Sequence, residues 1–408
     1  MSAGSQPSVA ETRADMSGRS AQSHADSRHL GICHIASGDR WAGAEVQLLT
    51  LLKGLQQIPD VRLCAIFLNE GRPASEARRI GIEVCVLDES ELSFFRILAG
   101  AGRFLAGKDI QVLHSHRYKE NLLAAFLARR YRVPVHVSTY HGAPEPFTGW
   151  RGLKQGAIQL LDRQVSLHMT DRIISVSEEL RASLLRRVPA NKVVMIHNGI
   201  DDAAVSSRLT ATEAKQRLGI PADSPVIGTA GRLEPVKRLE IFLNAAQSIG
   251  REMPNAKFLI AGDGTEAARL RSLAASLGFR ERVLFLGQRD DIYDVIRAMD
   301  IFVFCSDHEG LPMALLETLY LGVPVVARPV GGIAEVIQDG TSGVFVHSAD
   351  PSELASACVA LLRDALRREA LTRAGIAIVA RAFTSRHSAE QTAALYRSLS
   401  GNARASVR

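Results

Sequence analysis

The sequence predicts an α/β protein built from two doubly wound domains, and three observations support this. Short apolar segments alternate with helical ones along most of the 408 residues, as in parallel sheets that are covered by helices on both faces. The alternation pauses once, at 201–224, and then starts again. The composition, 46% hydrophobic and 23% charged, is that of an ordinary globular protein, and the chain is long enough for two cores.

The first run of expected strands is rich in Val, Ile and Leu without strict alternation, which is typical of strands that are buried on both faces. Helical patterns such as AEVQLLTLLKGL at 44–55 and KENLLAAFLARR at 119–130 lie between them. The expected strands are 30–36, 61–68, 82–88, 110–116, 133–140, 172–177 and 193–198. We therefore expect a first Rossmann-like domain over 30–200.

The second run follows a polar segment, 201–224, that contains one short helix and is expected to be a linker. Its strands are expected at 225–231, 257–262, 282–287, 301–306, 323–327 and 343–346. Two such runs imply a second Rossmann-like domain, 225–382, that faces the first across a cleft. Because ligands bind such sheets at the carboxyl ends of the strands, the loops after the strands are the places to look for chemistry.

The bulk features point to the cytoplasm. Residues 1–29 are rich in Ser, Ala, Gly, Asp and Arg and have no hydrophobic stretch, so we expect a disordered leader and not a secretion signal. The five cysteines form no CxxC pair, which favours buried, reduced thiols. No apolar run approaches the ~20 residues that cross a bilayer.

The net charge of +6 is compatible with nucleic acid, an anionic membrane surface or a phosphorylated substrate as partner. Much of the basic charge lies in the first half, at 103–108, 127–132, 150–154 and 185–188. Solvated helix faces explain these segments equally well. Nucleic acid is the least expected partner, because no nucleic-acid module is recognisable and few aromatic residues can stack bases.

Glu309 and Glu317 lie eight positions apart in HEGLPMALLE, where a buried strand is expected to turn into a helix. Gly310 frees the backbone, and Pro312 suits the first turn of a helix over roughly 312–321. The free N–H groups of a helix start favour a phosphate, whereas carboxylates accept hydrogen bonds from hydroxyl groups. A nucleotide sugar has both kinds of group and would satisfy the whole arrangement.

Two loops at strand ends carry further candidate residues. In SGDRWAGAE, at 37–45, Gly43 lets a ligand approach the backbone, but the GK[ST] of a P-loop is missing, which excludes that kind of ATPase or kinase. In GRLEPVK, at 231–237, Arg232 and Lys237 can hold a diphosphate. Removing one preorganised donor of this kind typically costs about 3–4 kcal/mol of transition-state stabilisation. A plain turn and a solvated basic pair are the alternatives.

GDGTEA, at 262–267, matches the dinucleotide-binding pattern G-x-G-x-x-A. The match is weak, because it follows the second strand of its domain and Asp290 lies 26 residues past Gly264, beyond the expected ~20. An oxidoreductase is therefore disfavoured. PVGGIAEVI, at 329–337, is another strand–glycine–helix junction and is expected to extend the anion-binding floor near the two glutamates.

Three histidines are expected at the carboxyl ends of strands. His141 precedes Gly142, and His114 and His116 flank Ser115. His141 is the best single candidate for catalysis. The His-x-His pattern suggests a metal, but no Asp, Glu or Cys partner accompanies it, so zinc is not expected.

With these motifs in this order, the chain resembles the retaining glycosyltransferases of family 4, which have the GT-B fold. The resemblance covers roughly 30–400. A final segment at 383–400 resembles the last helix of such enzymes, which crosses back onto the first domain. The motifs are GAE (43–45), YHG (140–142), IHNGID (196–201), GRLEPVK (231–237), GDG (262–264), FLGQRDDI (285–292), EGLPMALLE (309–317) and PVGGIAEVI (329–337).

The resemblance implies a sugar-nucleotide donor that is bound mainly by the second domain. By position, Glu317 would hold the ribose hydroxyls and Glu309 would contact the donor sugar. Arg232 and Lys237 would hold the diphosphate, and His141 would lie near the transferred sugar. The other donor-binding positions would be Gly43 on the phosphate side, Gly262, Arg289 beside the base, and the backbone of Gly310, Leu311 and Pro312.

The same resemblance implies electrostatic catalysis in which cations stabilise the leaving nucleotide diphosphate, with no cofactor and no divalent metal. Its catalytic residues would be His141, Glu309, Arg232 and Lys237. Two departures from the family pattern stand out. Arg238 replaces a frequent glycine and is expected to face solvent, and Ala42 stands where the family often has glycine.

We expect a bacterial-type enzyme of polysaccharide or lipopolysaccharide biosynthesis that uses a UDP- or GDP-sugar. The acceptor is expected to be a cell-surface or extracellular glycan, either free or linked to a lipid. Segments 94–108 and 149–165 are basic and partly apolar, and would contact an anionic inner membrane from the cytoplasm. Helices packed on the sheet are the alternative for these segments. A sugar-nucleotide epimerase of the same fold and a non-catalytic relative that binds sugar nucleotides remain open.

Overall fold

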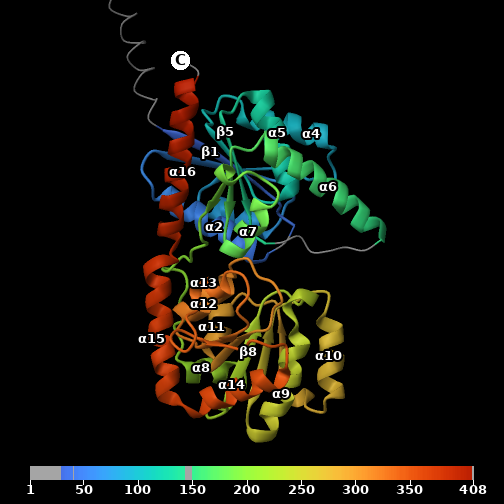
Figure 1. Cartoon of the computed structure of the whole chain (residues 1–408), viewed down its shortest axis with the longest axis vertical. Helices are drawn as coiled ribbons and strands as arrows, with labels where there is room; N and C mark the ends of the chain where they lie inside the picture. Colours follow the sequence, from blue (N-terminus) through green and yellow to red (C-terminus); the bar gives the residue numbers. More distant parts are fainter. Residues whose placement is uncertain (1–28, 40, 143–148, 407–408) are drawn as a thin grey trace, which may run out of the picture.

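The computed structural model describes residues 29–39, 41–142 and 149–406. Two α/β domains follow one another along the long axis of the molecule (Figure 1). The first contains a seven-stranded sheet in the order β3-β2-β1-β4-β5-β6-β7, and the second a six-stranded sheet in the order β10-β9-β8-β11-β12-β13. The predicted fold of two doubly wound domains is confirmed. The leader expected at 1–29 lies, except for its last residue, outside the described residues.

Every strand pair in the first sheet is parallel, and helices cover both of its faces. The strands are β1 (Leu30–Ala36), β2 (Val61–Phe67), β3 (Glu83–Val86), β4 (Val112–Ser115), β5 (Val135–Tyr140), β6 (Arg172–Ser175) and β7 (Val193–Met195). The helices are α2 (Gly43–Gln56), α3 (Arg72–Arg79), α4 (Phe94–Leu105), α5 (Tyr118–Tyr131), α6 (Gly149–His168) and α7 (Glu178–Leu185).

The second sheet is also parallel. Its strands are β8 (Val226–Ala230), β9 (Lys257–Ala261), β10 (Val283–Gly287), β11 (Ile301–Phe304), β12 (Val325–Ala327) and β13 (Val344–Phe345). Its helices are α8 (Ala211–Arg217), α9 (Leu239–Glu252), α10 (Ala267–Ser276), α11 (Ile292–Arg297), α12 (Met313–Tyr320), α13 (Ile333–Val336), α14 (Pro351–Arg363) and α15 (Ala365–Ala382), and α16 (Ser385–Ser406) follows them.

The strand order explains where a ligand can bind. β1 lies between β2 and β4, and β8 lies between β9 and β11, so the direction in which successive strands are added to the sheet reverses beside each of these central strands. A crevice forms at such a switch point, outside the carboxyl ends of the strands. The loops that follow β1 and β8 therefore meet between the two domains.

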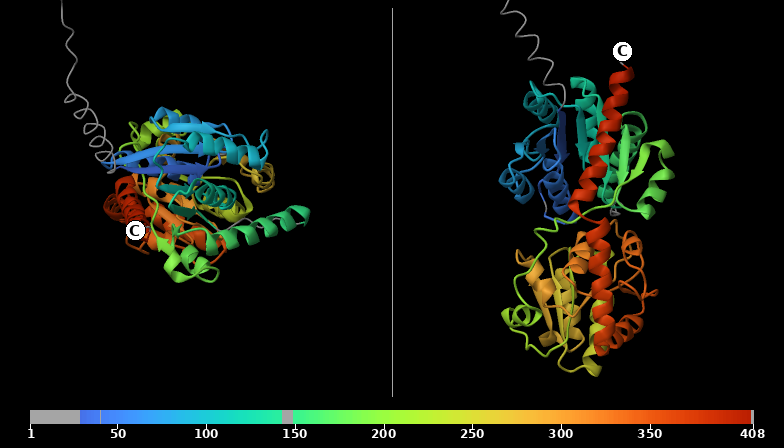
Figure 2. Two further views of the ribbon diagram at one scale, coloured as in Figure 1. Left: turned by 90° about the horizontal axis from the view of Figure 1, so that it is seen from above. Right: turned by 90° about the vertical axis from the view of Figure 1, so that its left-hand side faces the viewer.

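The chain crosses between the domains twice, and the two crossings are paired. The Ile200 N–H donates to the Phe383 carbonyl at 2.8 Å, and the Ser385 N–H donates to the Ile200 carbonyl at 2.6 Å. After the second crossing α16 packs on α2 and buries Tyr396 in the first domain. In Figure 2 the red helices α15 and α16 run along both domains. Among the described residues, no helix is both long and apolar enough to cross a bilayer.

Candidate functional site

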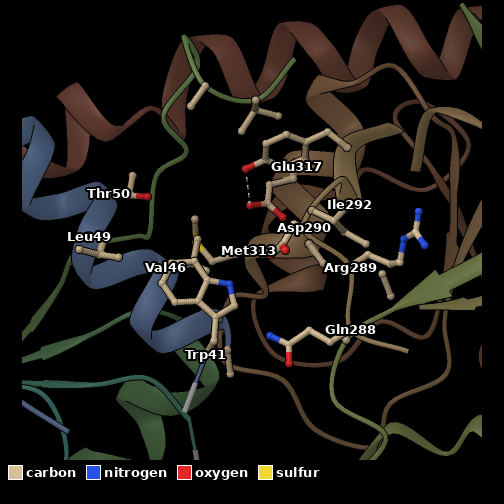
Figure 3. A pocket seen from close by; sticks show the side chains of 18 of the residues that line it. Trp41, Val46, Leu49, Thr50, Gln288, Arg289, Asp290, Ile292, Met313 and Glu317 are labelled. Atoms are coloured by element: carbon tan, nitrogen blue, oxygen red, sulfur yellow. Dashed lines mark hydrogen bonds between the residues drawn. The ribbon is translucent and has the colours of Figure 1, made fainter. Parts of the chain in front are cut away.

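A cavity of about 490 Å³ lies between the domains, at the carboxyl ends of both sheets. Figure 3 shows Trp41 and Val46 of the first domain on one side and Gln288, Arg289 and Glu317 of the second on the other. Five residues of the predicted donor site line this cavity together, namely Gly43, Arg232, Gly262, Arg289 and Glu317. Residues as far apart in sequence as Gly43 and Glu317 thus belong to one site.

Glu317 of α12 is the buried acid of the cavity. Its residue is 9% exposed, and its Oε1 accepts a hydrogen bond of 3.3 Å from the Tyr293 hydroxyl. Burial raises the pKa of Glu317 to about 7, because the charged carboxylate loses its hydration. A ligand hydroxyl that donates to this side chain would therefore replace lost water and favour the ionised form.

Glu309 is held by two donors just outside the residues that line the cavity. Its Oε1 accepts from Lys237 Nζ and from Ser306 Oγ, each at 2.6 Å. Lys237 and Arg232 line a smaller adjoining hollow, and Arg232 also lines the main cavity. The two cations therefore connect the cavity with Glu309: Arg232 lines the cavity, and Lys237 contacts Glu309. Nothing in the sequence indicated that the predicted cation Lys237 would pair with a predicted acid.

The turn before α12 packs directly on the first domain. A Cβ added to Gly310 would lie 2.1 Å from the carbonyl oxygen of His141, so only glycine fits there. Gly331 has φ +53°, and a Cβ there would lie 1.8 Å from the Glu309 carbonyl oxygen. The glycines of the 329–337 junction thus support the turn. Pro312 is the N-cap of α12 and has no N–H, so of residues 310–312 only Gly310 and Leu311 can donate to an anion.

The N-terminus of α2 reaches the cavity through Gly43. The buried carboxylate of Glu45 accepts from the Ala42 N–H at 3.1 Å and from the guanidinium of Arg117. These contacts fix the start of the helix. Among the residues that the structure describes, the side chain nearest to a Cβ at Gly43 would be that of Met313 at 4.0 Å, so this loop has room for a methyl group or a ligand.

Arg238 does not simply face solvent, contrary to the expectation from the sequence. It donates to Glu240 at 2.5 Å and to Asp307 at 2.8 Å. Its φ of +50° lies in the left-handed region, where glycine has no steric cost. The two ion pairs hold a non-glycine residue in that conformation.

A second group of contacts at the cavity was not visible in the sequence. Arg72 of α3 donates to Asp290 across the domain boundary at 2.5 Å, and its guanidinium lies 4.3 Å from the centre of the Trp41 ring. Arg289 makes two hydrogen bonds of 2.7 Å to Asp291. The sequence analysis placed Arg289 beside the base but did not single out Trp41 or Arg72.

His141 is not among the residues that line the cavity or the adjoining hollow. It belongs to a cluster of histidines that includes His34 of β1, which the sequence analysis did not single out. Nitrogens of His34, His114 and His116 lie within 4.8 Å of one another. Both nitrogens of His114 already have partners, the Tyr396 hydroxyl at 2.5 Å and Thr139 Oγ1 at 2.7 Å. His34 Nδ1 and His116 Nε2 lie 2.9 Å apart and are hydrogen-bonded to each other, so these two nitrogens are also already paired. The absence of a metal from the reaction remains a prediction.

Two doubly wound domains with a buried carboxylate and fixed cations at the cavity between them are the arrangement expected of a GT-B glycosyltransferase. A model of "Glycosyltransferase Family 4" matches residues 41–204, and a model of "Glycosyl transferases group 1" matches residues 210–377. The chain belongs to this family of glycosyltransferases, which use nucleotide sugars, so the resemblance seen in the motifs is confirmed.

Individual relatives agree with this assignment. The chain is 30% identical over 310 residues to a D-inositol 3-phosphate glycosyltransferase of Stackebrandtia nassauensis, covering 70% of this chain and 67% of that protein. It is 26% identical to the Escherichia coli UDP-Gal:alpha-D-GlcNAc-diphosphoundecaprenol alpha-1,3-galactosyltransferase, over 79% of this chain and 88% of that protein. The crystal structure of Anabaena HepE in complex with UDP-glucose superimposes with a TM-score of 0.80 at 20% identity, covering 91% of this chain and 100% of HepE.

Proposed function

We propose that this glycosyltransferase moves a sugar, with retention of anomeric configuration, from a UDP- or GDP-sugar to a cell-surface or extracellular glycan. One observation carries the proposal: Arg232 belongs to both the main cavity and the hollow that contains Lys237, whereas Glu317 lines only the main cavity. A nucleotide whose ribose binds Glu317 can therefore place its diphosphate beside Arg232 and Lys237, with the attached sugar toward Glu309.

The residues act on different parts of the donor. The Glu317 carboxylate accepts hydrogen bonds from the ribose hydroxyls, and Arg289 borders the base. Arg232 and Lys237 neutralise the charge that develops on the diphosphate as the sugar bond breaks. Lys237 also holds Glu309 at 2.6 Å, which fixes the carboxylate that contacts the donor sugar. The acceptor hydroxyl attacks from the face that the diphosphate leaves and passes its proton to the departing diphosphate oxygen, so the configuration is retained.

The names of the relatives indicate which donor and which acceptor to test first. HepE has been crystallised with UDP and with UDP-glucose, which favours a uridine nucleotide as the first donor to test. The Escherichia coli relative acts on a diphosphoundecaprenol-linked sugar, and another relative is a lipopolysaccharide core mannosyltransferase of Rhizobium meliloti. These names favour a lipid-linked glycan as the acceptor.

An exposed aromatic group on the first domain suits such an acceptor. Phe94, Phe95 and Phe126 of α4 and α5 make edge contacts, with ring centres 5.9 and 5.7 Å apart, and Phe95 is 79% exposed. Arg129 and Arg130 of α5 lie nearby in sequence. Aromatic side chains next to basic ones favour contact with an anionic membrane. Segment 149–165 was the second segment expected to contact the membrane. The structure does not describe the side chains of 149–155 and 157.

Flotation with vesicles of anionic lipid tests this surface. Phe95→Ser should reduce vesicle binding at low salt. Leu366→Ser removes a residue that is 80% exposed on the second domain and should leave binding unchanged. Wild-type protein that does not float, or equal loss in both variants, would contradict membrane contact.

The transfer reaction is tested without knowing the acceptor. Nucleotide sugars are incubated with the protein, and slow transfer to water is followed by NMR of the anomeric protons. Retention predicts that an α-linked donor first releases the α-anomer together with the nucleoside diphosphate. First release of the β-anomer would contradict retention. Conversion of the sugar while it remains attached to the nucleotide would identify an epimerase instead.

A further inference from the structure

Three histidines of the first domain form a hydrogen-bonded row across its sheet. His34 Nδ1 lies 2.9 Å from His116 Nε2, and His116 Nδ1 lies 3.2 Å from His141 Nε2. The neighbouring rings are nearly coplanar, with interplanar angles of 22° and 18° and ring centres 5.2 and 5.5 Å apart, as in-plane hydrogen bonds between ring edges require. The row begins in β1, passes the end of β4 and ends just after β5. We call His34, His116 and His141 the histidine row.

The two ends of the row carry its unusual feature. The Nε2 of His34 and the Nδ1 of His141 are buried and have no hydrogen-bond partner among the described residues. A neutral imidazole has one N–H and one lone pair, so each hydrogen bond in the row fixes the next. Only two arrangements satisfy both bonds: the free N–H lies either on His141 Nδ1 or on His34 Nε2.

The surroundings distinguish the two arrangements. A buried N–H without an acceptor is rarer in proteins than a buried acceptor without a donor. The unpaired N–H is therefore expected at the end of the row where an oxygen of a substrate can supply the acceptor. His34 is fully buried in the central strand. His141, by contrast, is only partly buried, and its backbone touches Gly310 in the turn that carries Glu309, at the boundary between the domains.

We propose that the histidine row holds His141 as a neutral Nδ1–H donor aimed at the reacting sugar, with His116 and His34 as positioning residues. All three histidines then carry their proton on Nδ1. The inference rests on the proposed function, because an oxygen of the transferred sugar is the acceptor that completes the row.

The row stays uncharged across the working pH range. Burial lowers the pKa of His34 and of His141 to about 3 and that of His116 well below its usual range, and Arg117 lowers the last two further. The other titratable groups packed here, His114, His136 and Tyr396, are themselves buried. The row therefore selects a tautomer and does not carry a charge.

The tautomers are read directly by 15N NMR of protein labelled at histidine, without substrate. We expect the Nδ1–H form for His34, His116 and His141, the form that free histidine in water disfavours. The signals are assigned from the variants His34→Phe and His116→Gln. An Nε2–H signal from His116 or His141 would overturn the proposal, as would a change of these signals on adding Zn²⁺ or EDTA, because a bound metal would then organise the row.

Kinetics test whether the row acts through His141. His116→Phe keeps the ring but breaks both bonds, and kcat for donor consumption should fall on the order of tenfold to a hundredfold, while KM for the donor stays within about threefold. His116→Gln restores one acceptor and one donor and should recover most of kcat. His136→Phe is the control, because His136 is buried in β5, outside the row, with its Nδ1 3.2 Å from the Met169 carbonyl oxygen.

Equal losses in His116→Phe and His136→Phe, or no recovery in His116→Gln, would overturn the proposal. Failure of the proposed function gives a different result. Wild-type protein would then release no nucleoside diphosphate from any donor, while the NMR signals would still decide the tautomers of the row.

Discussion

Glu317 shows how one residue can couple stability to the site. Its folded-state pKa of about 7 lies above the ordinary value of 4.5, so between these pH values the native state binds a proton that the unfolded state has lost. The free energy of unfolding therefore falls as the pH rises from about 4.5 to about 7. The loss is on the order of 3 kcal/mol at most.

Glu317→Gln removes this loss. Without ligand, we expect the variant and the wild type to be similarly stable at pH 5, where Glu317 is protonated, and the variant to be more stable at pH 8. Urea unfolding at both pH values measures the difference. Glu120, whose pKa burial also raises to about 7, adds the same trend to both proteins and cancels in the comparison. A stability difference that does not change with pH would contradict the account.

The pair of Lys237 and Glu309 makes a second prediction at the residue scale. Lys237→Met keeps the apolar stem but removes the charge from both the diphosphate and Glu309, so kcat should fall about 10²- to 10³-fold. Lys215→Met is a matched control, because Lys215 likewise pairs with a carboxylate, Asp300 at 2.8 Å, and does so away from the cavity. The control should lower the melting temperature but leave kcat of the folded enzyme unchanged. Equal kcat losses would show that only folding is affected.

At the scale of elements, the turn before α12 joins the two domains. Gly310→Ala puts a Cβ against the His141 carbonyl oxygen, and overpacking of this kind typically costs about 1–3 kcal/mol. We expect a lower melting temperature and slower donor consumption. Gly142→Ala adds the same methyl group one residue after His141, where the space is open: no atom of the described part of the chain, apart from its chain neighbours, lies within 4 Å. Equal melting temperatures of the two variants would contradict a role of this turn in the contact between the domains.

The elements also show what the sequence could predict. The strands were predictable, because short continuous apolar runs such as 30–36, placed between helical patterns, are typical of strands that are buried on both faces. The loops of the site were predictable as well, because ligands bind at the carboxyl ends of such strands. The pairing of Lys237 with Glu309 and the addition of His34 to the histidines were not predictable. Both depend on which side chains of distant segments meet, and neither periodicity nor spacing carries that information.

At the scale of the whole molecule, α16 ties the end of the chain to the first domain. Tyr396 is fully buried there, and its hydroxyl lies 2.5 Å from His114 Nδ1. Tyr396→Ala should destabilise the protein by about 3–5 kcal/mol, and Tyr396→Phe by about 1–3 kcal/mol through the unsatisfied histidine. Arg386→Ala, on the exposed face of the same helix, should stay within about 0.5 kcal/mol. Chemical unfolding checks the order; a Tyr396→Ala variant as stable as Arg386→Ala would contradict it.

The central claim is that the cavity between the domains binds a nucleotide diphosphate through Glu317. Thermal shift against a panel of nucleoside diphosphates and nucleotide sugars tests it most directly, with Glu317→Ala beside wild type and the exposed Glu369→Ala of α15 as control. Ligand at about 100 times its Kd should stabilise wild type and the control by about 2.7 kcal/mol. We predict that one nucleotide family produces this shift and that Glu317→Ala abolishes it. No shift with any nucleotide, or an undiminished shift in Glu317→Ala, would contradict the account.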